Sequence, residues 1–172
     1  MMDNLKPMLR YIVAGKFTRD YLVFPDGRVY NDIKGGNLFY SAAGLSLWDN
    51  KVGLVGLVSE DYPVEWLQEA ERKGFDIRGV QVLPNHFDQR RFIAYPVLDE
   101  PDYKNPIGHY SRINQPFPKT LLGYSDLPDA NHNEEQNKSI RIKDFPFDYL
   151  DVSAVHIGAM EYSLQTRLPT FF

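Results

Sequence analysis

The stretch NDIKGGNLFYSAAGLSLW, residues 31–48, places two adjacent glycines directly before an apolar run. Apolar residues in that run recur at the three- and four-residue spacings of one helix face, which predicts a helix over residues 37–48. Gly35 and Gly36 lack side chains, so the backbone before this helix can turn tightly or approach a ligand closely. The first N–H groups of a helix have no partner inside it and can bind such a ligand. The stretch therefore predicts either a simple turn or the entrance to a binding site.

Three short runs in the sequence are almost entirely apolar, at residues 11–15, 52–58 and 152–157. Runs of this length and composition are typical of strands that are buried on both faces of a parallel sheet. A second helix-period pattern opens after Pro63, and Gly74 is a suitable stop for it. Its N-cap is either Asp61 or Tyr62. Strands of this kind alternating with helices predict an α/β fold with a largely parallel sheet.

The segment before the glycine pair contains a hairpin signal. Two β-prone stretches, residues 21–24 and 28–33, are separated by the tripeptide Pro-Asp-Gly. Proline presets φ, aspartate tolerates the turn and glycine supplies a positive φ, so this tripeptide predicts a tight reversal. Further strands are expected over residues 80–83 and 91–97. Between residues 96 and 146, proline, asparagine and aspartate are frequent, which predicts a long irregular connection.

The composition excludes several classes of protein and of site. The 172 residues are 43% hydrophobic, which is enough for one globular domain with its own core. A net charge of -4 gives no electrostatic footprint for nucleic acid or for an anionic membrane. Because cysteine is absent, disulfide scaffolds, thiolate metal sites and cysteine nucleophiles are excluded. No run approaches the roughly 20 apolar residues of a membrane span, and no secretory signal opens the sequence, so a cytoplasmic protein is expected.

Two glycine-containing segments and the histidines carry no site signal of their own. The segment GKFT at residues 15–18 lacks the earlier glycine and the Ser/Thr directly after lysine that a phosphate loop needs. Gly53 and Gly56 lie within an expected strand without the spacing of a dinucleotide site, which favours close packing there. The four histidines have no metal-ligand spacing, so no metal site is expected, and His156 is interpreted as a core residue.

Asp20 comes just after the first apolar run, on the side where open α/β sheets bind their ligands. Taken alone, it is more naturally a turn former, and the same holds for Gly35 and Gly36. Taken together, these residues indicate one kind of ligand. A sugar hydroxyl needs a carboxylate acceptor and backbone N–H donors that can come close to it.

Three segments, VAGKFTRDYLVF, KGGNLFYSAAGLSLW and KVGLVGLVSEDYPVEWLQEAERKGFDIRGV, resemble the N-terminal half of the ribokinase-like (PfkB) carbohydrate kinases in order and spacing. The resemblance covers roughly residues 10–98, with a weaker likeness around DVSAVHIGAM. It implies a three-layer α/β/α fold with a largely parallel sheet and a small β lid built from residues 21–34 and 88–98. The chain, residues 1–172, would then be an incomplete N-terminal portion of a single domain, with a long irregular insert over residues 99–147.

The resemblance also implies an activity, the transfer of the γ-phosphoryl group of ATP, with Mg²⁺, to a hydroxyl of a sugar or nucleoside. The family's catalytic Gly-Ala-Gly-Asp segment does not occur in this sequence, so no catalytic residue is named. The chain would supply the substrate-recognition half. Its nucleotide and metal sites would lie outside these residues.

The family's substrate contacts carry over to five positions. Asp20 would bind substrate hydroxyls, Gly35 and Gly36 would let the backbone approach the sugar, and Asn37 lies beside them. Tyr40 stands where many members have an asparagine, and its ring would leave less room for small furanoses. The family's glycine-containing turn after the second strand of the sheet reads SEDYP here, without its glycines.

Other readings stay open from the sequence alone. A truncated or degenerate relative that binds a ligand or partner without catalysis is favoured by Tyr40, Pro63 and the absent catalytic segment. A nucleotide-binding oxidoreductase would need a glycine-rich turn after Gly15, where the chain has KFTR. Lid strands in this family often pair between subunits, so a homodimer through residues 21–34 is predicted. The acceptor could be a sugar, a nucleoside or a vitamin-like alcohol.

Overall fold

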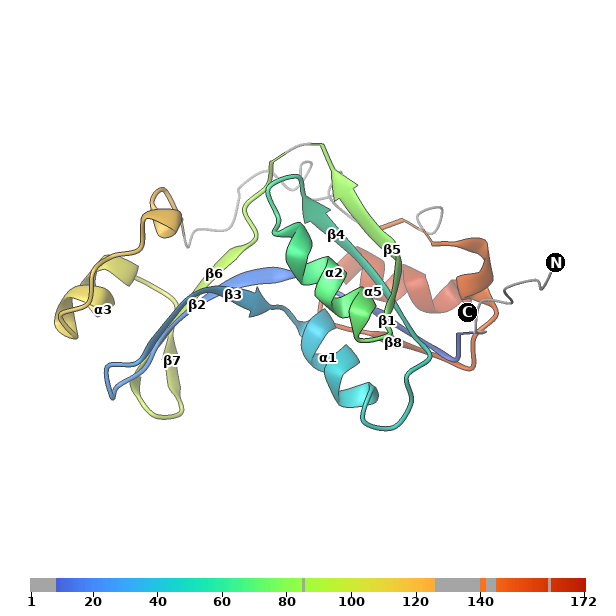
Figure 1. The fold of residues 1–172 in the computed structure, drawn as a ribbon, viewed down its shortest axis with the longest axis horizontal. Coiled ribbons are helices and arrows are strands. Elements are labelled where there is room, and N and C mark those ends of the chain that lie inside the picture. The colour runs from blue at the N-terminus through green and yellow to red at the C-terminus, as the bar shows by residue number, and fades with distance from the viewer. Residues whose placement is uncertain (1–8, 85, 126–139, 142–144, 161) are drawn as a thin grey trace. The chain divides into compact units, whose positions relative to one another are not determined.

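The computed structural model describes residues 9–84, 86–125, 140–141, 145–160 and 162–172 (Figure 1). They fall into two compact units. The larger one, called here the α/β unit, takes in the described residues of Met1–Phe17, Gly36–Phe87 and Asn133–Phe172. The other, the small unit, takes in those of Thr18–Gly35 and Asp88–His132.

The α/β unit is built on a parallel sheet of four strands. In spatial order these are β5 (Asp76–Leu83), β4 (Val52–Ser59), β1 (Tyr11–Ala14) and β8 (Ala154–Ile157). β1 lies between β4 and β8, with Tyr11 opposite both Val52 and Ala154. This sheet, with helices packed on it, confirms the predicted α/β class.

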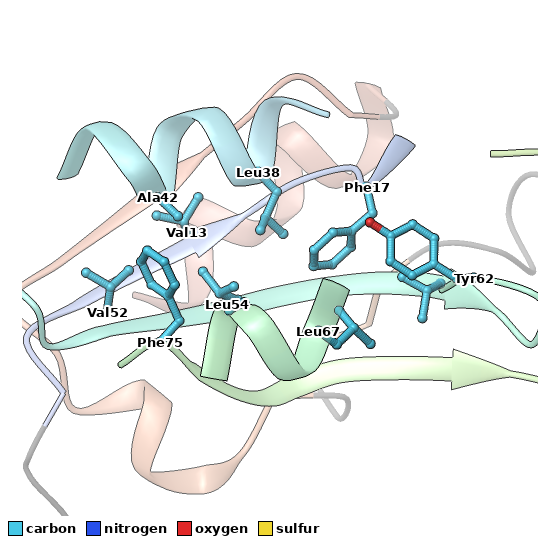
Figure 2. Packing of buried hydrophobic residues seen from close by; sticks show 11 residues of the cluster. Val13, Phe17, Leu38, Ala42, Val52, Leu54, Tyr62, Leu67 and Phe75 are labelled. Carbon is cyan, nitrogen blue, oxygen red and sulfur yellow. The ribbon is translucent and has the colours of Figure 1, made fainter. Parts of the chain in front are cut away.

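Side chains of β1 and β4 alternate between two apolar layers, as expected for strands covered on both faces. On one face, α1 (Asn37–Leu45) and α2 (Val64–Arg72) bring Leu38, Ala42 and Leu67 against Val13 and Leu54 (Figure 2). On the other face, Ile12 and Val55 pack with Tyr149 of η3 (Phe147–Leu150) and Leu168 of η4 (Leu168–Phe171). Each fully buried valine, leucine or isoleucine side chain among these stabilises the fold by about 1.5–3 kcal/mol. The sheet is thus the middle of three layers.

The glycines of β4 serve close packing, as the sequence indicates. A Cβ at Gly56 would lie 2.5 Å from Cε2 of Phe17, and one at Gly53 would lie 2.9 Å from Cζ of Tyr149. Phe17 in turn meets Phe39 and Tyr62 edge to face, with ring centroids 4.9 Å and 5.8 Å away. Glycine at these two positions lets large rings settle against the strand.

The small unit contains a second sheet, in the order β3 (Val29–Gly35), β2 (Thr18–Val23), β6 (Arg90–Val97) and β7 (Glu100–Asp102). β2 and β3 form the predicted hairpin, and Gly27 in its turn has a φ of 84°. β2 pairs with β6 in parallel, and β6 with β7 antiparallel. One face is covered by α3 (Pro106–Arg112) and η1 (Lys119–Leu121), through an apolar cluster of Tyr21, Phe92, Tyr110 and Leu121.

The segment expected to be an irregular insert holds β7, α3 and η1. Asn105 caps α3 in a left-handed conformation with φ 48°, and its Oδ1 accepts the N–H of Gly108 at 3.1 Å. Pro106 follows at the first helical position, where its missing N–H costs nothing. Residues 126–139 and 142–144 of the insert lie outside the described residues.

One local expectation, at the start of α2, needs correction. The N-cap of α2 is Pro63 and makes no side-chain hydrogen bond, so neither Asp61 nor Tyr62 has that role. Proline fixes φ and removes its own N–H, so the helix begins directly after it. Gly74, with φ 94°, follows the end of α2 as predicted.

The third apolar run also differs from expectation. β8 begins at Ala154 and pairs only with β1 among the described strands, so it is an edge strand and is not buried on both faces. His156 is exposed, and its Nε2 lies 3.1 Å from Oγ of Ser41 on α1, so it is not a core residue. α5 (Tyr162–Arg167) and η4 follow β8. In the described part of the chain, no helix combines the length and apolarity needed to cross a membrane.

Candidate functional site

Asp20 lies inside β2, not in a turn, and only 2% of it is exposed. The interpretation of Asp20 as a turn former is therefore wrong. The hydroxyl of Thr18, two residues earlier in the strand, donates to Oδ1 of Asp20 at 2.6 Å. The pairing of β2 with β3 shifts register directly after Asp20, and such bulges commonly re-aim a side chain. The carboxylate is thus held by a neighbour on its own strand while its second oxygen remains an acceptor.

Gly35, at the end of β3, lies opposite Thr18 and against the side chain of Asp20. A Cβ at position 35 would overlap the Asp20 carboxylate. Any residue larger than glycine would therefore displace that carboxylate. Glycine is therefore needed at position 35 because the Asp20 carboxylate fills the space that a side chain there would take.

Gly36 is the N-cap of α1, with φ 98° and ψ 148°, a backbone conformation that is essentially restricted to glycine. It offers no side-chain cap, and within the described residues the N–H groups of Gly36 and Asn37 have no hydrogen-bond acceptor. The next N–H of the helix, that of Leu38, donates to the carbonyl of Lys16 at 3.4 Å. The start of α1 therefore retains two backbone donors that a ligand can use.

Asn37 uses both ends of its side-chain amide within the α/β unit. Its Oδ1 accepts the N–H of Lys16 at 2.8 Å, and its Nδ2 donates to the carbonyl of Ala159 at 2.6 Å. Gly15, directly after β1, and Gly158, directly after β8, flank the amide. Asn37 thus connects α1 to the chain beyond β1 and beyond β8.

Tyr40 lies one turn further along α1, where its N–H donates to the carbonyl of Gly36 at 3.4 Å and 61% of the residue is exposed. The five predicted residues are therefore divided between the units. Asp20 and Gly35 come together in the small unit, whereas Gly36, Asn37 and Tyr40 form the first turns of α1 in the α/β unit.

Several neighbours of these residues were not anticipated. Thr18 could have been found, because residues two apart in a strand share a face. The contact of Asn37 with Ala159 could not, because it depends on β8 lying next to β1 across a long stretch of sequence.

A second polar cluster follows β4, in the segment where the family's turn glycines are missing. Ser59 donates its hydroxyl to the carboxylate of Asp61, and Nδ1 of His86 lies 3.2 Å from Oδ1 of Asp61. Burial alone would raise the pKa of Asp61, but the Ser59 hydrogen bond and the nearby His86 outweigh it and lower that pKa. Among the described residues no three His, Cys, Asp or Glu side chains gather as a metal site would require.

No protein-family model matches the chain. A cytidine kinase from Thermococcus kodakarensis is 44% identical to it over 77 residues, which are 45% of this chain and 27% of the relative. The chain therefore spans about a quarter of the length of that curated relative.

Solved structures with a similar fold were also found. A ribokinase from Cryptococcus neoformans in complex with ADP aligns with a TM-score of 0.46 and 18% identity, over 56% of this chain and 33% of that one. A nucleoside kinase from Burkholderia thailandensis in complex with inosine aligns with a TM-score of 0.46 and 17% identity, over 55% of this chain and 34% of that one. With the sequence relative, the resemblance indicated by the motifs is confirmed: over part of its length, this chain is similar to ribokinase-like kinases of sugars and nucleosides.

Proposed function

We propose that this chain supplies the substrate-recognition part of a kinase that phosphorylates a hydroxyl of a nucleoside or sugar. The observation that carries the proposal is the fit between Asp20 and Gly35, in which a buried carboxylate occupies the space left by an absent side chain. The identity to a cytidine kinase supports a nucleoside as the acceptor. Cytidine contains a ribose, whose hydroxyl groups suit a carboxylate acceptor.

Asp20 is proposed as the residue that accepts hydrogen bonds from the ribose hydroxyls. An ionised carboxylate only accepts hydrogen bonds, and bonds to a charged group contribute about 1.5–3 kcal/mol each. Because Thr18 already donates to Oδ1, the second oxygen is the one proposed to meet the ligand. Low exposure of the group strengthens such bonds by excluding competing water.

Gly35, Gly36 and Asn37 are proposed to contribute through the backbone. The unused N–H groups of Gly36 and Asn37 are donors at a helix N-terminus, where an electronegative oxygen is favoured. Tyr40 is proposed to border the ligand with its ring, which would favour an acceptor larger than a free furanose.

The proposal assigns recognition, not catalysis, to these residues. Phosphoryl transfer depends on positioning and on stabilising charge in the transition state, and the family's Gly-Ala-Gly-Asp segment does not occur in this sequence. No residue described here is proposed as the catalytic base. Transfer from ATP with Mg²⁺ is proposed for the whole kinase of which this chain would be part.

The experiment is to measure binding of cytidine, inosine and ribose to the whole protein by calorimetry, comparing the native sequence with Asp20→Asn. Asp20→Asn retains the size of the side chain, and we expect a loss of at least tenfold in affinity for the preferred ligand. The matched control is Asp26→Asn, in the exposed turn of the same hairpin, where affinity should not change. Equal affinity of native protein and Asp20→Asn would remove Asp20 from the site.

A second candidate is a relative of these kinases that binds the ligand without phosphorylating it. Two departures from the family's pattern favour it: Tyr40, which stands where many members have an asparagine, and Pro63, in the turn that lacks the family's glycines. Nucleoside binding without consumption of ATP, measured on the whole gene product with MgATP present, would support this candidate against the kinase.

A homodimer through residues 21–34 is proposed as the assembly. In the described sheet of the small unit β3 is an edge strand, and an edge strand offers backbone groups to a second copy. Sedimentation across a hundredfold range of concentration tests it, and a monomer throughout would refute it.

A further inference from the structure

The side chain of Asn37 is at the meeting point of three segments of the α/β unit. Its Oδ1 accepts from the N–H of Lys16, just beyond β1, at 2.8 Å. Its Nδ2 donates to the carbonyl of Ala159, just beyond β8, at 2.6 Å. Asn37 is itself the first residue of α1. One amide therefore joins the ends of two neighbouring strands to the start of a helix.

The surrounding residues leave room for this amide and little more. A Cβ at Gly15 would lie 2.6 Å from Oδ1 of Asn37, and one at Gly158 would lie 3.0 Å from its Cγ. Both glycines have negative or unexceptional φ, so their lack of a side chain is needed for space and not for backbone freedom. Glycine at 15 and 158 and asparagine at 37 depend on one another.

We infer that Asn37 is a positioning residue, which holds the N–H groups of Gly36 and Asn37 in the arrangement that receives the substrate. This inference rests on the proposed function. Because both ends of the amide are already bonded within the chain, a direct side-chain contact with the ligand would compete with those bonds. Asn37 acts through the backbone donors that follow Gly35, and the carbonyl of Lys16 fixes the next donor, that of Leu38.

The two bonds of the amide can be separated by one substitution. Asn37→Asp keeps an oxygen acceptor for Lys16 but replaces the donor to Ala159 with a second oxygen. At neutral pH that oxygen is charged and faces a carbonyl, which repels it. At acidic pH the protonated carboxyl group has an O–H that can donate to the same carbonyl. The carbonyl of Ala159 disfavours the charged form of this introduced group, whereas the N–H of Lys16 and the start of α1 favour it, so the native arrangement returns only once acid has protonated the carboxyl group.

The experiment measures calorimetric binding of cytidine to the whole protein between pH 4 and pH 7.5, for the native sequence and for Asn37→Asp. We expect Asn37→Asp to bind at least tenfold more weakly than the native protein at pH 7.5, and to approach the affinity of the native protein as pH falls towards 4, where an ordinary aspartate is about half protonated. The same two proteins are compared by hydrogen exchange, in which the Lys16 amide should stay protected in Asn37→Asp at both pH values. A role in stability alone would not make ligand affinity recover in acid.

Two further variants are controls for effects on folding that do not involve the chemistry of the Asn37 amide. Ser41→Ala, on the same helix as Asn37, removes the contact with His156 of β8 without touching the Asn37 amide, and its affinity should follow the native profile. Gly158→Ala leaves Asn37 chemically intact but crowds its amide, and it should weaken binding without any recovery in acid.

The outcomes separate this inference from the function on which it rests. If the native protein binds cytidine but Asn37→Asp binds equally well at pH 7.5, or shows no recovery towards pH 4 while folded, Asn37 is not a positioning residue. If the native protein binds none of cytidine, inosine and ribose, the proposed function fails and the inference fails with it.

Discussion

Gly35 and Asp20 lie on paired strands of the small unit so closely that a Cβ on residue 35 would overlap the Asp20 carboxylate. This close contact explains why residue 35 is a glycine, which the sequence alone does not show. The missing side chain provides space for an acidic group, and the second glycine separately provides a backbone conformation. The pair therefore combines two different requirements at adjacent positions.

Gly35→Ala should destabilise the protein and displace Asp20. Forcing one methyl group into occupied space costs about 1–3 kcal/mol in the free energy of unfolding. Urea unfolding measures this loss. The matched control is Gly44→Ala in α1, where a Cβ meets nothing within 4 Å and alanine should stabilise the helix by about 0.5–1 kcal/mol.

A double-mutant cycle tests the cause of that loss. Asp20→Ala removes the group that the new methyl would meet, so Gly35→Ala should cost at least 1 kcal/mol less in the Asp20→Ala background than in the native one. Additive effects of the two substitutions would contradict the close packing of these residues.

Gly36→Ala should also destabilise the protein, but for a different reason. At φ 98° and ψ 148° a side chain is strained by about 1–3 kcal/mol whatever space is available. Thermal unfolding should show a lower midpoint, and cytidine affinity should fall because the helix start must shift. Gly27→Ala, in the hairpin turn at φ 84°, is the control, since it should also lower the midpoint but leave affinity unchanged.

Much of the fold follows from local pattern in the sequence. The apolar spacing after the glycine pair predicts α1, and Pro-Asp-Gly predicts the β2–β3 hairpin, because each depends on neighbouring residues alone. β8 was misjudged for a related reason. An apolar run shows what a strand prefers to contact, but whether a second strand lies beside it is decided by topology.

The candidate site was predicted only in part. Asp20 and Gly35 were named, but their contact depends on the register of two strands, which the hairpin turn does not fix by itself. The amide of Asn37 meets Ala159 through the parallel pairing of β1 with β8, and no local signal indicates this. Residue types can be read from the sequence, whereas their partners come from the tertiary fold.

Arg78 joins β5 to η3 and should make stability depend on pH. Its guanidinium contacts Asp76 at 2.6 Å and Asp148 at 2.7 Å. Burial alone would raise the pKa of Asp76, but hydrogen bonds from Arg78 lower it, and the same guanidinium lowers the pKa of Asp148. Since both values are lowered by folding, the stabilisation is complete at neutral pH and is lost as pH falls below about 4.

Arg78→Gln should therefore reduce the free energy of unfolding by about 0.5–1 kcal/mol at pH 7, a modest figure because the pair is partly exposed. The difference from the native protein should shrink as urea unfolding is repeated towards pH 3. Arg28→Gln, which removes the exposed pair with Asp26, is the control and should change stability much less. A difference that stays constant with pH would show that lost packing on Tyr149, not charge, is responsible.

Asn105 should decide whether α3 forms, and with it the apolar cover over Tyr21 and Phe92. Asn105→Ala loses both the cap to Gly108 and the tolerance of a φ of 48°, so it should cost about 1–2 kcal/mol in unfolding free energy. Asn105→Gly loses only the side-chain cap, keeps the backbone conformation, and should cost a few tenths of a kcal/mol. Limited trypsin digestion at Arg112 provides a local readout, because cleavage should be faster in the alanine variant and nearly native in the glycine variant. Equal cleavage of all three proteins would mean that Asn105 does not determine the formation of α3.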